Sequence, residues 1–160
     1  MKADSGSVAR EETADEAAQE WVVFACDGHR FALPLGRVRE VLEPRPFTRL
    51  PGCGPAVCGL VGVRGRVITT FDFGAAVALR PATSATDHRL ILLEHGERVF
   101  ALAVDGIVAV ARAAAAELPL RADTLRALDI ESDDLLGIGA FGDQPFLAVD
   151  PDRLLARLLP

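Results

Sequence analysis

From Trp21 onward, the chain consists of short apolar runs separated by glycine, proline and aspartate. Runs such as WVVFAC (21–26) and LILL (90–93) have the length of strands and end at turn-forming residues, which is typical of a many-stranded β fold. Residues 1–19 are instead polar, charged and rich in alanine, with no apolar periodicity. The pattern therefore predicts a mobile N-terminal tail at 1–19 and a folded, mainly β domain at 20–160.

The folded part contains an internal repeat. The segment FALPLGRVREV (31–41) matches FALAVDGIVAV (100–110), with the first three residues identical and apolar residues at three further shared positions. Each copy follows an apolar strand and a glycine turn. Farther along, GLVGVRGRVITTFD (59–72) runs parallel to GIGAFGDQPFLAVD (137–150), with single-residue adjustments. Both of these segments end in an aspartate that precedes a helical pattern.

This repeat predicts two tandem small β barrels with short helices, the first at roughly 20–80 and the second at roughly 86–150. Exchange of strands between the barrels stays open. After the second barrel, Asp150 is placed to cap a C-terminal helix at 151–159, with Pro151 at its first position and leucines on one face. Each barrel alone has a thin core, so the two are expected to pack together with a groove at their seam.

Charge and composition narrow the functional classes. The net charge is −6, and six of the 23 acidic residues stand in the first twenty positions, so the folded part is nearly balanced. Its arginines are dispersed, without the basic stripe and interleaved aromatics of a nucleic-acid site. The N-terminus lacks the apolar core of a signal peptide, and the most apolar stretch is interrupted by charged residues. We therefore expect a cytoplasmic protein that neither binds nucleic acid nor inserts into a membrane.

No cofactor or metal site is expected. Cys26, Cys53 and Cys58 have no CxxC spacing and no histidine pair nearby, so we interpret them as reduced thiols. The segment GIGAFGD (137–143) has the GxGxxG spacing of a dinucleotide site, but a proline-containing strand pattern follows where such a site needs a helix. Its glycines are better explained as the second copy of GLVGVRG, where they permit tight bends.

Catalytic patterns are weak. There is no G-x-S-x-G elbow, and the DFG triplet at Asp72 lacks the other kinase motifs. Asp72 and Asp105 could form the acid pair of a small hydrolase, although both residues also fit capping and turn positions. The sequence therefore favours a binding module that is not an enzyme, and the hydrolase is the remote alternative.

One charged residue stands out: Arg64, in VGVRGRV, has apolar residues on both sides. A guanidinium in this setting needs a carboxylate, a carbonyl or a partner, because burying it unpaired is costly. The nearest carboxylate by pattern is Glu40, in GRVREVLE. In the second copy the position of Glu40 holds Ala109 and the corresponding turn has no base, so the shared fold does not require the two charges. A solvated turn arginine is the alternative interpretation.

From about Trp21 to Leu159, these segments resemble in order the CheW-like coupling domain of bacterial chemotaxis systems. The family pattern Gly-x-x-x-Leu-Arg-Gly-x-x-x-Pro-x-x-Asp is met by Gly59, Arg64, Gly65 and Asp72, and its second Asp-Gly by Asp105 and Gly106. These last four glycine and aspartate positions, Gly65, Asp72, Asp105 and Gly106, are taken as structural motif residues. The chain departs from the pattern at Gly62-Val63, where the family has Asn-Leu, and at Thr69, where it has proline.

The resemblance implies two five-stranded SH3-like barrels and a scaffold role. Such a protein joins the cytoplasmic tips of methyl-accepting chemoreceptors to the regulatory domain of a CheA-type histidine kinase, within membrane-bound receptor arrays. The receptor tip would lie in the groove between the barrels, and barrel ends would contact the kinase. Residues expected near the receptor site, with Arg64 paired to Glu40, are Val38, Glu40, Gly59 and Arg64.

The same fold also allows a second function. A CheW-like coupling protein can serve a chemosensory-like pathway that controls surface motility, development or gene expression. The departures at Gly62-Val63 and Thr69 bear on which receptor is bound.

Overall fold

The computed structural model describes residues 18–113 and 133–159. The expected mobile tail therefore lies almost entirely outside the described residues. Within the described ranges the chain forms ten strands in two five-stranded sheets. Within the same ranges it also forms four short helical segments, of which the last is the C-terminal helix. The prediction of a mainly β fold that ends in a helix is confirmed.

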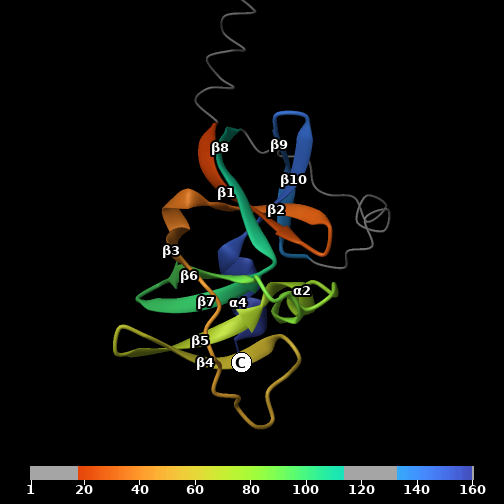
Figure 1. Ribbon diagram of the computed structural model, residues 1–160. Coiled ribbons are helices and arrows are strands. Elements are labelled where there is room, and N and C mark those ends of the chain that lie inside the picture. The colour runs from red at the N-terminus through yellow and green to blue at the C-terminus, as the bar shows by residue number, and fades with distance from the viewer. Residues whose placement is uncertain (1–17, 114–132, 160) are drawn as a thin grey trace, which may run out of the picture.

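The two sheets, called A and B, lie one above the other (Figure 1). Sheet A has the strand order β8 (Gly106–Ala113), β1 (Gln19–Cys26), β2 (His29–Pro34), β10 (Gln144–Val149) and β9 (Leu135–Phe141). Sheet B has the strand order β3 (Val38–Leu42), β6 (Arg89–His95), β7 (Arg98–Val104), β5 (Arg66–Asp72) and β4 (Val57–Val63). The helical segments are η1 (Leu35–Arg37), α2 (Phe73–Ala76), η2 (Ala82–Ser84) and α4 (Pro151–Leu158).

The two repeats are interlocked. The β1–β2 hairpin of the first repeat lies in sheet A with β8, β9 and β10 of the second, and the β6–β7 hairpin of the second lies in sheet B with β3, β4 and β5 of the first. When the repeats are overlaid, both sheets have the same strand order, including one parallel pair, β2 with β10 and β7 with β5. The ranges 20–80 and 86–150 thus describe repeats along the chain, whereas each sheet takes strands from both.

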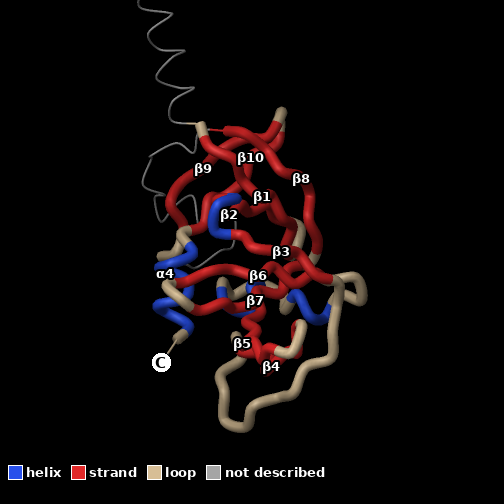
Figure 2. Tube along the Cα trace, turned by 90° about the vertical axis from the view of Figure 1, so that its left-hand side faces the viewer, coloured by secondary structure: helices blue, strands red, loops and turns tan. Residues whose placement is uncertain are grey.

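Each sheet also closes on itself. In sheet A the outer strands β8 and β9 come into contact. In sheet B the chain that follows β3 returns to the opposite outer strand, because Thr48 exchanges two backbone hydrogen bonds of 2.8 Å with Leu60 of β4. Helix α4 descends from sheet A along one side of sheet B, where it contacts β6 (Figure 2).

One hydrophobic cluster joins the two sheets. Phe24 and Phe31 of sheet A pack edge-on against Phe73 of α2, with ring centroids 4.9 and 4.7 Å apart, and the cluster continues into β6 and β7. The opposite face of sheet A closes on a smaller cluster that contains Trp21 and Phe146, 5.7 Å apart. Because β1 and β10 bury both faces, their sequences are continuous apolar runs without polar alternation.

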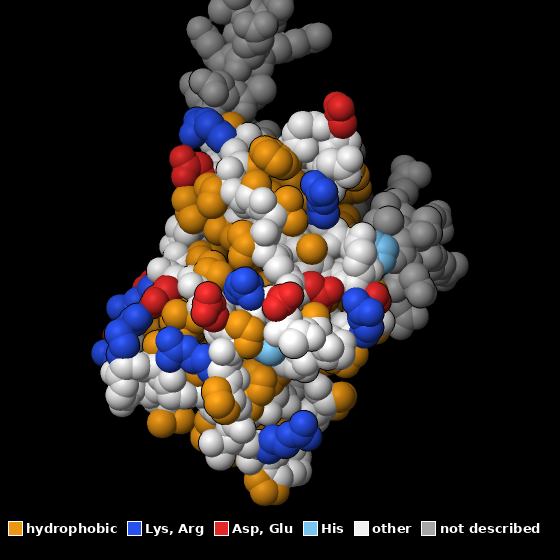
Figure 3. Space-filling view, viewed as in Figure 1, with side chains coloured by type: hydrophobic (Ala, Val, Ile, Leu, Met, Phe, Trp, Pro, Cys, Tyr) orange, Lys and Arg blue, Asp and Glu red, His pale blue; other side chains and the backbone are white. Residues whose placement is uncertain are grey.

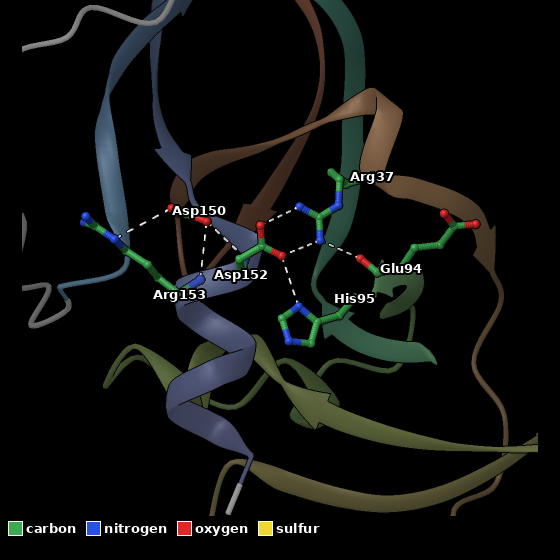
Figure 4. A network of polar contacts seen from close by, with 6 residues as sticks. All are labelled: Arg37, Glu94, His95, Asp150, Asp152 and Arg153. Carbon is green, nitrogen blue, oxygen red and sulfur yellow. Dashed lines mark hydrogen bonds and ion pairs between the residues drawn. The ribbon is translucent and has the colours of Figure 1, made fainter. Parts of the chain in front are cut away.

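In the part of the chain that the structure describes, the chain crosses between the sheets twice, and charged contacts hold each crossing. At the first, from β2 to β3, the guanidinium of Arg37 donates to both carboxylate oxygens of Asp152 on α4, at 2.9 and 2.6 Å (Figure 4). It also donates to the carbonyl of Glu94, at 2.7 Å, and His95 Nδ1 lies 3.0 Å from the same carboxylate. This contact set, here called the Arg37 clamp, connects η1, α4 and the end of β6.

At the second crossing, from β7 to β8, the residue on the connection is an acid, whereas at the first crossing it is the base Arg37. Asp105 stands at the crossing and accepts a hydrogen bond of 2.9 Å from the backbone N–H of Asp27 at the β1–β2 turn. Arg80, beyond α2, donates its backbone N–H to the Asp27 carboxylate at 3.1 Å, and its guanidinium lies 3.8 Å from Asp105. The β2–β3 connection of the first repeat and the β7–β8 connection of the second are equivalent. A base holds the first of them in place, and an acid holds the second.

The Arg37 clamp predicts a specific acid dependence of stability. Hydrogen bonds from Arg37, and then from His95, lower the pKa of Asp152 from 3.8 to about 2. A carboxyl with a lowered folded-state pKa contributes stability that is present above its unfolded pKa and is lost as pH falls between about 4 and 2. Because the Asp152 side chain is 57% exposed, this contribution is about 1 kcal/mol or less.

We expect Asp152→Asn to lower the free energy of unfolding at neutral pH and to flatten its pH dependence in this window. Urea unfolding followed by the fluorescence of Trp21, the single tryptophan of the chain, measures both effects. Asp87→Asn, at an exposed loop position, is the control and should leave the profile unchanged. An Asp152→Asn profile that coincides with the wild-type profile would contradict the clamp.

Candidate functional site

The β4–β5 hairpin carries the most unusual backbone of the candidate site. Its two-residue loop consists of Arg64 and Gly65, with φ of 48° and 78°, and Val63 pairs with Arg66 across the turn. Tight hairpins of this kind need positive φ at both loop positions, which favours Asn, Asp or Gly. Gly65 meets this need without strain. Arg64 holds a conformation that costs energy for a side chain with a Cβ, so the position of its guanidinium matters.

Arg64 forms a bidentate ion pair with Glu40. Its Nη1 donates to Glu40 Oε1 at 2.9 Å, and its Nη2 donates to Oε2. Glu40 lies on β3 and Arg64 at the end of β4, so the pair links the two outer strands of sheet B. The hydrogen bonds lower the pKa of Glu40 and raise the pKa of Arg64. The Arg64 side chain is 69% exposed, which leaves the pair accessible to a partner.

Gly59 allows the loop after β3 to lie against β4. Its φ is 137°, and a Cβ at this position would lie 2.3 Å from the carbonyl oxygen of Thr48. Thr48 is the residue that pairs with Leu60, so a side chain at Gly59 would disrupt the closure of sheet B. The close approach of Thr48 therefore requires glycine at position 59, independently of any contact with a partner.

The expected receptor-site residues lie around this closure. The structure brings Glu40 and Arg64 into direct contact. Val38 begins β3, two residues before Glu40, and packs against the shared hydrophobic cluster. Gly59 lies on β4, on the strand that leads to Arg64. Their contact with a receptor remains a prediction.

Exposed apolar residues on the outer strands were not singled out by sequence. On β8, Ile107, Val108 and Val110 are 36%, 38% and 58% exposed, and Val41 on β3 is 39% exposed. Figure 3 shows hydrophobic side chains gathered over sheet A on the face turned to the viewer, above a band of charged ones. The signal was present in the run GIVAVARA, which is apolar although the strand is at a sheet edge. Such a patch is typical of a protein contact.

Asp72 is a buried acceptor of four hydrogen bonds. One oxygen accepts from the backbone N–H of Ala75 at 3.1 Å and of Ala82 at 2.8 Å. The other accepts from the backbone N–H of Thr83 at 3.0 Å and from its hydroxyl at 2.8 Å. Asp72 thus caps α2, as expected, and also fixes the segment that leads to β6. Both oxygens are engaged in structure, which gives the residue a role that does not involve hydrolysis.

Asp105 and Gly106 mark the second crossing between the sheets. One Asp105 oxygen accepts from Asp27, and the other is buried without a hydrogen-bond partner among the described residues. No atom of the described residues lies within 4 Å of the position of a Cβ on Gly106, so no close contact within this part of the chain requires glycine there. The pair belongs to a sheet-to-sheet connection and not to a simple hairpin turn.

The glycines of GIGAFGD have structural causes. A Cβ on Gly139 would lie 2.3 Å from the ring of Phe146, and Gly142 has a φ of 59° in the β9–β10 turn. Strand β10 follows this turn, where a dinucleotide site needs a helix. Gly142 and Asp143 occupy the turn positions that Arg64 and Gly65 occupy in β4–β5.

The described residues offer little support for a metal site or a reactive cysteine. They contain no group of three or more His, Cys, Asp or Glu side chains arranged to hold a metal ion. Burial raises the pKa of Cys26, and it raises the pKa of Cys58 to about 12, so neither thiol favours the reactive thiolate form. Among the described residues no helix is long and apolar enough to cross a membrane.

Comparison with known proteins identifies relatives over most of the chain. Residues 20–159 match the family model of the CheW-like domain. A chemotaxis protein CheW of Klebsiella aerogenes is 24% identical over 147 residues, which are 89% of this chain and 84% of that protein. Protein PilI of Pseudomonas aeruginosa is 32% identical over 94 residues, 58% of this chain and 53% of PilI.

A solved structure shows the same fold. The crystal structure of the scaffolding protein TtCheW from Thermoanaerobacter tengcongensis aligns with a TM-score of 0.73, at 20% identity, over 85% of this chain and 91% of that one. This likeness confirms the expected two-barrel fold.

The hydrogen bonds of Asp72 predict a large effect of a small change. In Asp72→Asn the new amide N–H group must face backbone N–H donors in a buried site, so we expect a loss of about 3 kcal/mol in the free energy of unfolding. Asp150→Asn is the matched control, because Asp150 caps α4 with only two backbone hydrogen bonds at its surface. Its loss should be smaller, about 0.5 kcal/mol or less, because asparagine caps a helix N-terminus about as well as aspartate does. Equal losses in the two variants, measured by urea unfolding, would show that Asp72 is only a helix cap.

Proposed function

The chain belongs to the CheW-like domain family, and on this premise we propose that it is a non-enzymatic scaffold of chemotaxis signalling. It joins the cytoplasmic tips of methyl-accepting chemoreceptors to the regulatory domain of a CheA-type histidine kinase. It works in the cytoplasm and is recruited to membrane-bound receptor arrays. The ligand state of the receptor would then bias kinase activity through the geometry that the scaffold imposes.

The Glu40–Arg64 pair is the observation that carries this proposal. The equivalent turn in the second repeat is Gly142-Asp143, and the position of Glu40 holds Ala109, although both sheets have the same strand order. Closing the sheet therefore does not require the ion pair. An accessible, bidentate pair on a strained turn, present in one repeat only, supports a role in binding.

The apolar residues on the outer strands supply the other part of a contact surface. Val41 of β3 and Val110 of β8 are exposed, while the ion pair provides polar groups of fixed orientation. Protein contacts of moderate size combine an apolar centre with a polar rim in this way. We place the receptor tip on this surface, with Val38, Glu40, Gly59 and Arg64 near it.

The similarity to PilI favours a second candidate for the same scaffold. This relative has a higher local identity than the CheW of Klebsiella aerogenes, over a shorter segment. The corresponding proposal is a chemosensory-like pathway that controls surface motility, development or gene expression. The genes next to the coding sequence distinguish the two pathways, because the partner domains are of the same kinds in both.

The scaffold proposal predicts direct binding to both kinds of partner. Purified protein should retain the regulatory domain of a CheA-type kinase from the same genome in a pull-down, and separately a cytoplasmic receptor fragment. The isolated ATP-binding domain of the kinase is the control and should not be retained. Absence of binding to either partner under conditions in which all proteins are folded would contradict the proposal.

The ion pair predicts non-additive effects on receptor binding. Arg64→Ala and Glu40→Ala should each weaken the affinity for the receptor fragment by roughly tenfold, and the double variant should be no weaker than either single one. The reason is that each substitution removes the same oriented pair. Isothermal titration calorimetry of the receptor fragment with the wild type, the two single variants and the double variant gives the four affinities of this double-mutant cycle. Simply additive losses would mean that the two residues act separately.

A further inference from the structure

A small pocket opens beside the ion pair. It has a volume of about 140 Å³, and the apolar side of its lining consists of Val63, Ile68, Leu92 and Val99. Arginines complete the lining: Arg39, Arg64 and Arg66. Pockets for drug-sized ligands are larger, at about 300 Å³ or more, so this one fits a single side chain. It is called the Arg66 pocket below.

The arginines around the pocket differ in their partners. Arg64 is bound to Glu40 by two hydrogen bonds. Arg39 lies 3.7 Å from Glu94, and both of these side chains are about half exposed, which makes a weak ion pair. The side chain of Arg66 is exposed and forms no hydrogen bond or ion pair with any of the described residues. The pocket therefore has one guanidinium free to bind an anion.

The surroundings support a positive potential at this edge of the molecule. In Figure 3, Lys and Arg side chains gather at the left edge of the view, where Figure 1 places the free end of the β4–β5 hairpin. Arg66 follows the turn directly and pairs in the sheet with Val63, so the backbone holds its Cα in a fixed position. A free guanidinium on a rigid hairpin is well suited to bidentate recognition of a carboxylate.

The second repeat lacks these features. Gln144 occupies the position of Arg66 next to the β9–β10 turn, where it pairs with Phe141 as Arg66 pairs with Val63. The turn itself is Gly142-Asp143, which has an acid and no base. Because both hairpins occupy the same position in their sheets, the fold does not need an arginine at this point.

We propose that the Arg66 pocket binds a glutamate or aspartate side chain of the receptor tip, whose stem lies on Ile68 and Leu92 while its carboxylate pairs with Arg66. A cationic side chain would face three arginines at this place. A purely apolar one would cover a guanidinium without giving it a partner, which is costly. This inference rests on the proposed receptor binding and assigns to Arg66 a part in the choice among receptors.

Charge reversal at Arg66 tests the inference. Arg66→Glu should weaken the affinity for the cytoplasmic receptor fragment by roughly tenfold or more and should leave the affinity for the kinase regulatory domain unchanged. The wild-type affinity for the receptor should fall more steeply with salt than that of the variant. Arg98→Glu is the matched control, because Arg98 is an exposed arginine of β7 that lies over the ring of Phe100 and not in the pocket.

A charge swap identifies the partner group. With Arg66→Glu as the background, each acidic residue of the receptor tip is changed in turn to arginine, and one such change should restore binding. Circular dichroism and urea unfolding of every variant establish that the fold is intact.

The outcomes separate the two proposals. Receptor binding that Arg66→Glu leaves unchanged, or that Arg98→Glu weakens equally, overturns the pocket and leaves the scaffold intact. A wild-type protein that binds no receptor fragment overturns both.

Discussion

The reciprocal exchange of hairpins is the constraint on which the rest of the structure depends. Because β1 and β2 complete the sheet of the second repeat, and β6 and β7 complete that of the first, neither repeat can form a closed sheet alone. The shared aromatic cluster around Phe73 then buries faces of both sheets at once. Charged contacts hold the two crossings, with the base Arg37 at the centre of one and the acid Asp105 at the centre of the other. The position of one barrel relative to the other is thus built into the connectivity of the chain, and a surface that spans them has a defined shape.

Within this shared plan, the differences between the repeats indicate function. The β4–β5 and β9–β10 hairpins occupy equivalent positions in their sheets, and Gly139 and Gly142 show what the fold alone selects in the second of them. Only the first repeat adds Arg64, its partner Glu40 and the free Arg66. The strained backbone of Arg64 is the cost of placing a guanidinium at the end of a hairpin, and the exposed ion pair that results is available to a partner. The shared strand order thus leaves these positions free to differ between the two repeats.

Much of this could be predicted from the sequence. The two-barrel fold, the cap at Asp150 and the family follow from local patterns and a resemblance along the chain, and these three are confirmed. The Glu40–Arg64 contact followed from the pattern of charges. Exchange of strands between the barrels was left open by the sequence, because equivalent hairpins fit either sheet and no local pattern distinguishes them. The Arg37–Asp152 contact joins positions 115 residues apart, and the further hydrogen bonds of Asp72 come from Ala82 and Thr83, beyond the helix that it caps. Long-range pairings of this kind leave no signal in residue spacing.

The central claim is that one copy of this protein holds a receptor and a kinase at the same time. The most direct measurement is sedimentation velocity on an equimolar mixture of the protein, the cytoplasmic receptor fragment and the kinase regulatory domain, with each component labelled by a different chromophore. The account predicts a single faster boundary that contains all three labels, and its loss when the protein is omitted. Two separate binary complexes, in which receptor and kinase displace each other from the protein, would contradict it.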